Sequence, residues 1–316
     1  MAAVSTLVRV ATRKSALALA QASMVADQLA LSTGRAPILI PVTTVGDDAS
    51  GPLAVIGGTG VFVGAVRDAV LAGQADVGVH SLKDLPTTPH EVLVTAAVPK
   101  REDPRDALCA RDGLRLDSLD IGARIGTGSP RRASQLRSLR PDLNVVDIRG
   151  NVDTRLAKVT SGDVDAVVLA YAGLSRLGRT SAVSELLDSK KMLPAPGQGA
   201  LAVESRPDLE QTDPELFKAL IDLDDSQTHA AVIGERAVLH TLEAGCSAPV
   251  GALATITSAA DAQPEIHLRA VAASVDGLRV IRMFTTGPAR DAALVGGQLA
   301  DDMLAAGAAG LLQEPV

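Results

Sequence analysis

Residues 7–34, LVRVATRKSALALAQASMVADQLALSTG, decide the fold. The apolar run Leu7–Thr12 predicts a strand. Ser15 is a good N-cap for a helix that extends to Ser32, and Gly34 closes it. A strand that leads directly into a helix is the repeating element of α/β proteins. The segment therefore predicts the first strand and helix of an α/β domain.

Strands and helices continue to alternate along the chain, with apolar runs separated by helical periodicity. The expected strands are Pro37–Thr44, Ala75–Ser81, Arg124–Thr127, Asn144–Ile148, Asp165–Ala170 and Ala200–Glu204. The expected helices are Val61–Ala72, one starting at Ser129, and Asn151–Ser161. This alternation predicts parallel sheets in two doubly wound α/β lobes. The strand ends and helix starts of two such lobes would border one ligand cleft.

The C-terminal part follows a different order. A helix is expected at Ser226–Thr241, followed by strands at Val250–Thr257, Glu265–Ser274 and Leu278–Thr285, and a last helix at Arg290–Ala306. This order predicts a small α+β domain. The chain is therefore divided into residues 1–102 plus 197–222, residues 103–196, and residues 223–316.

Composition excludes several functions. The 316 residues carry a net charge of −7, which argues against a nucleic-acid or membrane-surface partner. Three Phe, one Tyr and no Trp are too few for a surface that stacks bases. Arg9, Arg13 and Lys14 interrupt what would be the apolar part of a signal peptide, and two distant cysteines form no disulfide framework. We expect a cytoplasmic protein, and nothing in the pattern demands an oligomer.

Positive charge is concentrated in one segment of this acidic chain. Residues 124–155 contain seven Arg and three Asp, a local balance of +4. Arg131 and Arg132 fall in the first turn of a predicted helix, where a cation opposes the helix dipole. Together with Arg149 and Arg155 they predict an anion site that takes carboxylate or phosphate. The alternative, a solvated helix face with surface ion pairs, is the preferred interpretation for Arg137 and Arg140.

A second group of polar residues, Ser81, Lys83 and Asp84, follows a buried strand. Catalytic groups of α/β proteins commonly lie at such strand ends. A carboxylate facing an arginine-rich cleft suits the stabilisation of a developing positive charge. His80 points the other way along the strand and is interpreted as a core residue rather than a base.

The two cysteines differ in their surroundings. Cys246 lies in the Gly- and Pro-bounded stretch EAGCSAPVG, where it could act as a nucleophile or an attachment point, although no neighbouring His or Lys would activate it. Cys109, in the apolar strand Ala107–Ala110, is expected to be buried and inert. No spacing matches a metal site or a phosphate-binding loop.

Taken in order, these motifs resemble the porphobilinogen deaminases, also called hydroxymethylbilane synthases. The segments that carry the resemblance are Thr12–Ser15 with Leu19–Gln21, Val79–Pro86, Lys100–Asp106, Arg149–Leu156, Leu169–Leu177, Pro196–Leu201 and Gly245–Cys246. The resemblance implies two lobes similar to those of periplasmic binding proteins around a cleft, plus a C-terminal domain. It implies a transferase of haem biosynthesis that joins four porphobilinogen molecules head to tail, releases ammonia, and hydrolyses off the product.

The resemblance also implies roles for individual residues. Cys246 would carry a dipyrromethane cofactor through a thioether, and Asp84 would be the catalytic carboxylate that assists loss of the amino group. The cofactor contacts implied are Ser81, Lys83, Thr127, Ser129, Arg131, Arg132 and Gly150. The substrate contacts implied are Arg13, Ser15, Phe62, Arg149, Arg155, Arg176 and Gln198. No metal is implied, and the ligands are porphobilinogen and the growing oligopyrrole.

The sequence departs from the family pattern in three places, the mildest being Ala244-Gly245 before Cys246, where the family has two glycines. Thr59 and Gly64 stand near Phe62 where the family usually has lysines. Pro130 precedes the arginine pair and removes one backbone N–H that could have met a carboxylate. An alternative function, a two-lobe dicarboxylate-binding or effector-sensing protein without catalysis, would explain the arginines but would leave Asp84 and Cys246 without a role.

Overall fold

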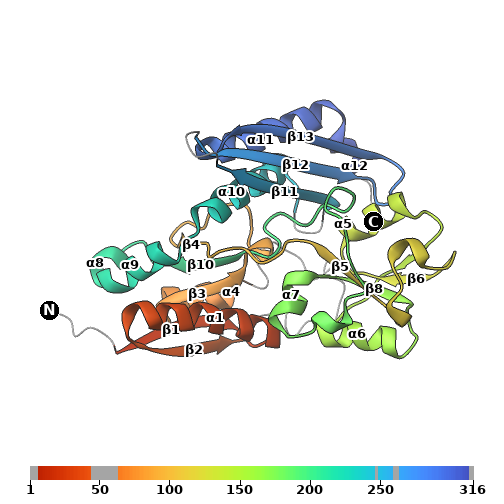
Figure 1. The fold of residues 1–316 in the computed structure, drawn as a ribbon. Helices are drawn as coiled ribbons and strands as arrows, with labels where there is room; N and C mark the ends of the chain where they lie inside the picture. Colours follow the sequence, from red (N-terminus) through yellow and green to blue (C-terminus); the bar gives the residue numbers. More distant parts are fainter. Residues whose placement is uncertain (1–5, 44–62, 246–247, 259–262, 313–316) are drawn as a thin grey trace. The chain divides into compact units, whose positions relative to one another are not determined.

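Three β-sheets organise the part of the chain that the structure describes (Figure 1). The structure, a computed structural model, describes residues 6–43, 63–245, 248–258 and 263–312. Its internal contacts divide the chain into two compact units. The first unit comprises Met1–Arg101 and Ala200–His229, and the second comprises Glu102–Gly199 and Ala230–Val316.

A five-stranded sheet in the order β2-β1-β3-β10-β4 forms the centre of the first unit. Its strands are β1 (Leu7–Arg13), β2 (Ala36–Val42), β3 (Val77–Ser81), β4 (Val94–Ala97) and β10 (Leu201–Ser205). Its helices are α1 (Ala16–Thr33), α4 (Gly64–Leu71), α8 (Leu209–Thr212) and α9 (Pro214–Leu223). Val8 and Val10 of β1 pack with α1 and α9, whereas Ala11 packs with α4. Because alternate side chains of a strand point to opposite faces, helices cover both faces of this sheet.

Helix α1 begins and ends where the sequence predicts. The Ser15 hydroxyl accepts a hydrogen bond from the Ala18 N–H at 3.3 Å, and Gly34 closes the helix with a left-handed φ of 69°. Strand β1 then lies between β2 and β3 in parallel register. The prediction made from residues 7–34 is confirmed.

A second five-stranded sheet, in the order β7-β6-β8-β5-β9, belongs to the second unit. Its strands are β5 (Asp106–Ala110), β6 (Arg124–Gly126), β7 (Asn144–Val146), β8 (Ala166–Ala170) and β9 (Glu185–Leu186). The helices are α5 (Pro130–Leu139), α6 (Val152–Thr160) and α7 (Tyr171–Arg176). Leu136 of α5 packs on the face that carries Leu108 and Ile125, and Leu174 of α7 packs on the face of Ala107 and Cys109. This lobe is therefore also doubly wound.

Both of these sheets are mixed, which corrects the expectation of parallel sheets. In the first unit β10 runs antiparallel to β3 and β4, and in the second β5 runs antiparallel to β8 and β9. Three strands of each sheet keep the parallel order. The hydrophobic pattern of a buried strand is the same in either direction, so the pattern alone could not set the direction of β5 and β10.

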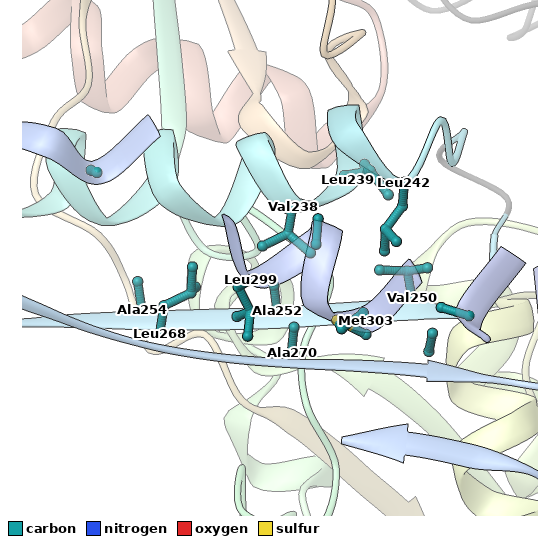
Figure 2. Close-up of a cluster of buried hydrophobic side chains, with 14 of the residues drawn as sticks. Val238, Leu239, Leu242, Val250, Ala252, Ala254, Leu268, Ala270, Leu299 and Met303 are labelled. Atoms are coloured by element: carbon teal, nitrogen blue, oxygen red, sulfur yellow. The ribbon is translucent and has the colours of Figure 1, made fainter. Parts of the chain in front are cut away.

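The C-terminal part of the second unit is a three-stranded antiparallel sheet with helices on one face. The strands are β11 (Val250–Thr257), β12 (Glu265–Ala273) and β13 (Val280–Pro288), and the helices are α10 (Ser226–Thr241), α11 (Ala292–Ala305) and α12 (Ala308–Leu312). Figure 2 shows Val238 of α10 and Met303 of α11 in one apolar cluster with Ala252 of β11. The predicted α+β fold of this part is confirmed.

Two differences from the predicted elements matter for the site. Helix α9, with its Pro214 start and Asp213 cap, was not predicted. Helix α4 begins at Gly64, and the first two residues of the predicted helix, Val61 and Phe62, lie outside the described residues. The three predicted domain boundaries stay a prediction.

Candidate functional site

A pocket in the first unit lies where β1 and β3 end and α1 begins. It has a volume of about 70 Å³ and is lined by Arg13, Ser15, Leu17, Ala18, Gln21, Val63, Val79, His80, Ser81 and Asp84. This space accommodates a group of the size of a carboxylate or a few water molecules. The pocket brings together four residues predicted for the site from two distant segments: Arg13, Ser15, Ser81 and Asp84.

The position of Asp84 follows from its neighbours. Leu82 and Leu85 are buried, and the 3₁₀ turn η1 (Leu82–Asp84) closes with a 3.1 Å bond from the Leu85 N–H to the Leu82 carbonyl. The Leu82 N–H also donates to the Ala200 carbonyl at 3.0 Å. With a buried leucine on each side, Lys83 and Asp84 lie on an anchored turn, and the Asp84 residue remains exposed. An exposed carboxylate on a fixed turn can meet a substrate without a rearrangement of the backbone.

Ser81 and Ser15 line the pocket with Asp84, and both also make hydrogen bonds that stabilise the fold. Ser81 donates from its hydroxyl to the Gln21 Oε1 atom of α1 at 3.1 Å. Ser15, the N-cap of α1, stands at the other side of the same helix start. The strand end and the helix end are therefore tied together at the pocket.

The predicted arginine pair of the second unit surrounds a carboxylate that the sequence did not single out. Asp106 has no exposed surface. Its carboxylate accepts from Arg131 Nη1 at 2.7 Å and from Arg132 Nε at 2.9 Å, and from Gln198 Nε2 at 2.9 Å. Arg131 also donates to the Leu193 carbonyl at 2.6 Å. Burial opposes the ionised form, but the two arginines outweigh it and hold the pKa of Asp106 well below its usual range.

Arg131 and Arg132 therefore have structural partners within the protein, and their expected role toward a ligand stays a prediction. Both are buried, and burial lowers the pKa of Arg131 against the attraction of Asp106. Two guanidinium groups around one carboxylate leave one positive charge in excess. The pair is both the structural partner of Asp106 and a source of net positive charge.

Arg149 and Arg155 extend this positive charge toward the helix α6 start. Burial lowers the pKa of Arg155, and the nearby charges of Arg132 and Arg149 lower it further, while Asp147 opposes them. Arg155 Nε donates to the Gly150 carbonyl at 2.8 Å, and the Arg149 Nε atom lies 3.4 Å from Asp147 Oδ2. Three cations that repel one another in a partly buried place are characteristic of an anion site.

The backbone around these arginines is closely packed at two glycines. A Cβ at Gly128 would lie 2.7 Å from the Ile148 carbonyl oxygen and 3.8 Å from Arg149 Cζ. Gly150 has a φ of 110°, and a Cβ there would lie 2.8 Å from the Thr154 Cβ atom. The turn of Thr127 and Ser129 is fixed by a 3.2 Å bond from the Ser129 N–H to the Thr127 hydroxyl. The predicted residues Thr127, Ser129 and Gly150 thus border the arginine cluster.

Arg176 and Gln198 lie in the same unit as the cluster. Arg176 Nη2 donates to the Gly199 carbonyl at 2.7 Å, and burial lowers the pKa of its guanidinium while Glu102 partly offsets that effect. Its Nε atom is buried with no hydrogen-bond partner among the described residues. Gln198 donates to the Pro104 carbonyl at 2.8 Å as well as to Asp106, so it is a structural bridge.

Four further expectations can be compared with the structure. Arg137 donates to the Val275 carbonyl, and Arg140 donates to the carbonyls of Leu116 and Leu119, so both have structural contacts rather than ligand positions. Cys109 is 2% exposed, and burial raises the pKa of its thiol to about 11, which confirms the inert core cysteine. His80 is buried as expected, yet it lines the pocket of Asp84.

Three charged residues in or near the candidate sites were missed: Asp106, and the ion pair of Arg67 with Glu204, whose Oε2 atom lies 3.2 Å from the pocket residue His80. Asp106 ends the segment Lys100–Asp106 that carried the family resemblance, and this was the one available signal. Glu204 follows three apolar residues in a fully buried strand, where a lone carboxylate is itself a sign of a buried partner. Cys246 and Phe62 lie outside the described residues.

Among the described residues, no three His, Cys, Asp or Glu side chains come together as metal ligands would. None of their helices combines the length and the apolar character that crossing a membrane requires.

The chain is similar to known proteins over nearly its whole length. Residues 8–214 match the family model described as "Porphobilinogen deaminase, dipyromethane cofactor binding domain", and residues 229–305 match "Porphobilinogen deaminase, C-terminal domain". "Porphobilinogen deaminase 1" of Streptomyces coelicolor is 53% identical over 97% of both chains. "Porphobilinogen deaminase" of Nocardia farcinica is 51% identical over 99% of this chain and 90% of that one.

A solved structure of a periplasmic substrate-binding protein of an ABC transporter from Coxiella burnetii is 18% identical. It covers 68% of this chain and 91% of that one, with a TM-score of 0.43.

The family matches and the curated relatives define the class of protein first: an enzyme, a transferase of tetrapyrrole biosynthesis. The chain belongs to the porphobilinogen deaminase family. It polymerises porphobilinogen and has the dipyrromethane cofactor-binding domain of that family. This decides between the two functions expected from the sequence, in favour of the enzyme.

Proposed function

We propose that Asp84 is the catalytic carboxylate of this transferase and that Cys246 carries the dipyrromethane cofactor. The observation that supports the first part is the pocket of the first unit, in which Asp84 shares a small space with Arg13, Ser15 and Ser81. Arg13 offers a cation to a substrate carboxylate, and Asp84 offers a negative charge a short distance away. This combination suits a substrate that is acidic at its edge and becomes positively charged at its reacting centre.

The steps follow from the chemistry of these side chains. Asp84 passes a proton to the departing amino group and then, as a carboxylate, stabilises the positive charge left on the substrate. Arg13, with Ser15, holds a substrate carboxylate so that the reacting carbon faces Asp84. Lys83, Phe62 and Gln198 are proposed as further contacts of substrate or cofactor. After four condensations, hydrolysis releases the linear product hydroxymethylbilane.

The residues of the second unit fit a polyanionic cofactor. The four cations Arg131, Arg132, Arg149 and Arg155 face the two carboxylates Asp106 and Asp147, which leaves two positive charges in excess. The buried Arg176 Nε, without a hydrogen-bond partner among the described residues, is a further donor. We assign these arginines, with Thr127, Ser129 and Gly150, to the carboxylates of the dipyrromethane and of the growing chain. When bound, the cofactor supplies the free pyrrole position to which porphobilinogen is added.

The proposal extends to the location and the assembly of the enzyme. We propose a cytoplasmic monomer. Support for the location comes from the relatives of the chain, which are bacterial enzymes named porphobilinogen deaminase. Sedimentation at several concentrations tests the monomer, since a dimer would raise the apparent mass as concentration increases.

Two measurements test the assigned residues. The denatured protein should carry a mass increase that is lost in Cys246→Ser, and a Cys109→Ala variant should keep it. Asp84→Asn should keep the mass increase and the folded state but lose nearly all turnover, because an amide neither gives up a proton nor carries a negative charge. Asp27→Asn, at an exposed carboxylate of α1, is the matched control and should turn over normally. Normal turnover in Asp84→Asn would remove Asp84 from the mechanism.

A further inference from the structure

Beneath the pocket of Asp84 lies a buried group of three charged or titratable side chains: Arg67 of α4, His80 of β3 and Glu204 of β10. The side chains of His80 and Glu204 are each 4% exposed. Arg67 donates from Nε to Glu204 Oε2 at 2.8 Å and from Nη2 to Oε1 at 2.7 Å. This is a bidentate pair, the geometry in which a guanidinium fixes a carboxylate most firmly.

His80 completes this group and connects it to the pocket. Its buried Nε2 atom lies 3.2 Å from Glu204 Oε2 and makes no hydrogen bond to the described residues, and His80 lines the pocket that also holds Asp84. The strand register explains the contact, because Glu204 pairs with Gly78 and stands diagonally from His80 on the same face of the sheet. A carboxylate oxygen this close to one ring nitrogen of a histidine favours the ring orientation that keeps the two atoms together.

The backbone leaves room for this arrangement at one position. A Cβ on Gly78 would lie 2.9 Å from Val66 Cγ1 and 3.4 Å from His80 Nε2. Glycine at this position lets α4 approach β3 closely, and this approach brings Arg67 within reach of Glu204. The close packing of α4 on β3 at this glycine is therefore what brings the polar side chains together.

The charges within the group balance. Burial alone would raise the pKa of Glu204, but its bonds to Arg67, with the contact to His80, lower the pKa to about 2. The charges of Arg67 and Glu204 cancel within the bidentate pair. Burying a polar array has a cost in desolvation that an apolar packing would avoid. A function for the array explains why the fold retains it.

We propose that Glu204, held by Arg67, is a positioning residue that fixes the His80 imidazole in the wall of the catalytic pocket. The proposal rests on the function proposed for Asp84 and adds a residue to it. A fixed ring keeps the shape and the polarity of the pocket constant while positive charge develops on the substrate. If the His80 ring could rotate, the development of positive charge on the substrate would be disturbed more than substrate binding. The change would therefore lower kcat rather than alter KM.

The test separates the position of His80 from the buried charge. R67M/E204Q removes both charges but keeps an oxygen at position 204 that can contact His80. R67M/E204L removes both charges and that oxygen. We expect the loaded R67M/E204Q enzyme to keep kcat within about threefold of the original, and the loaded R67M/E204L enzyme to lose kcat at least tenfold at nearly constant KM.

Three further readouts make the outcome decisive. The mass of the denatured protein gives the fraction that is loaded, and the thermal midpoint shows that both double variants fold. H80A should lose kcat to the same extent, and R67M/E204L added to H80A should cause no further loss, because both changes act through the same ring. Asp76→Asn, in the ion pair at the opposite end of β3, is the control and should leave kcat unchanged.

Equal kcat in R67M/E204Q and R67M/E204L, or additive losses with H80A, would overturn the proposal. In that case the array contributes to stability only. Failure of the proposed function would show differently, as normal turnover of Asp84→Asn whatever the behaviour of the position-204 variants.

Discussion

Asp106, which has no exposed surface, accepts a hydrogen bond from Arg132 Nε at 2.9 Å, so one of the expected cofactor arginines is held by a carboxylate from inside the protein. Asp106 starts β5, and Arg132 lies in the first turn of α5. A cation at a helix start opposes the helix dipole, and the buried carboxylate compensates for it. The position of the arginine is therefore determined before any ligand binds.

Replacement of Asp106 by asparagine should be strongly destabilising. The change leaves Arg131 and Arg132 buried without their shared negative charge, and breaking a buried pair in this way costs about 3–5 kcal/mol. The free energy of unfolding in urea at pH 7 measures the effect. Asp142→Asn, which breaks the more exposed pair with Arg140, is the control and should destabilise the protein much less. Equal losses in the two variants would contradict the role of Asp106.

The lowered pKa of Glu204 predicts how the free energy of unfolding depends on pH. Its folded-state pKa, about 2, lies below the ordinary value of 4.5, so the ionised group stabilises the folded protein above pH 4.5 and this stabilisation is lost as the pH falls toward 2. The difference in unfolding free energy between the original protein and Glu204→Gln should therefore be constant from pH 5 to pH 7 and shrink below pH 4.5. Urea denaturation at several pH values checks it. A difference that grows on acidification would contradict the assignment.

Arg155 should matter for acquiring the cofactor more than for folding. Its guanidinium is partly buried, next to Arg132 and Arg149, and it donates to the backbone carbonyl of Gly150. Loss of a charged hydrogen bond to a carboxylate corresponds to about 1.5–3 kcal/mol, so loading of apo-Arg155→Ala should need at least tenfold more porphobilinogen. The loaded fraction is measured by mass. Arg179→Ala, at a surface pair with Asp153, is the control, and the same requirement in both variants would contradict the role of Arg155.

The sequence predicted the local elements well because their signals are local. Ser15, Ser129 and Asn151 each accept a hydrogen bond from the backbone at the start of the predicted helix. The directions of β5 and β10 depend on which strands they join, and this is decided by packing of distant segments. Helix α9 was missed although Asp213 and Pro214 form a recognisable helix start.

The sequence predicted residues that line the candidate pocket. It did not predict the residues that hold the site's charged side chains in place. The pocket collects Arg13, Ser15, Ser81 and Asp84, all named from the sequence. Asp106 and Arg131 are hydrogen-bonded although they are 25 residues apart in the sequence, and Arg67 and Glu204 are hydrogen-bonded although they are 137 residues apart. Such pairs have no spacing rule, since only the fold brings them together.

Cys109 gives a last prediction, which concerns reactivity. The thiol lies in β5 on the face that packs with α7, and burial raises its pKa to about 11, so it is protonated at pH 8 and shielded from reagents. Iodoacetamide at pH 8 should therefore leave Cys109 unmodified in the folded protein and modify it once urea unfolds the chain. If Cys246 carries the cofactor, the loaded folded protein should take up no label at all, and Cys246→Ser should behave in the same way. The apo protein should take up one label, at Cys246. Labelling of Cys109 in the folded loaded enzyme would show that β5 opens. It would contradict the prediction that the core of the second unit is protected.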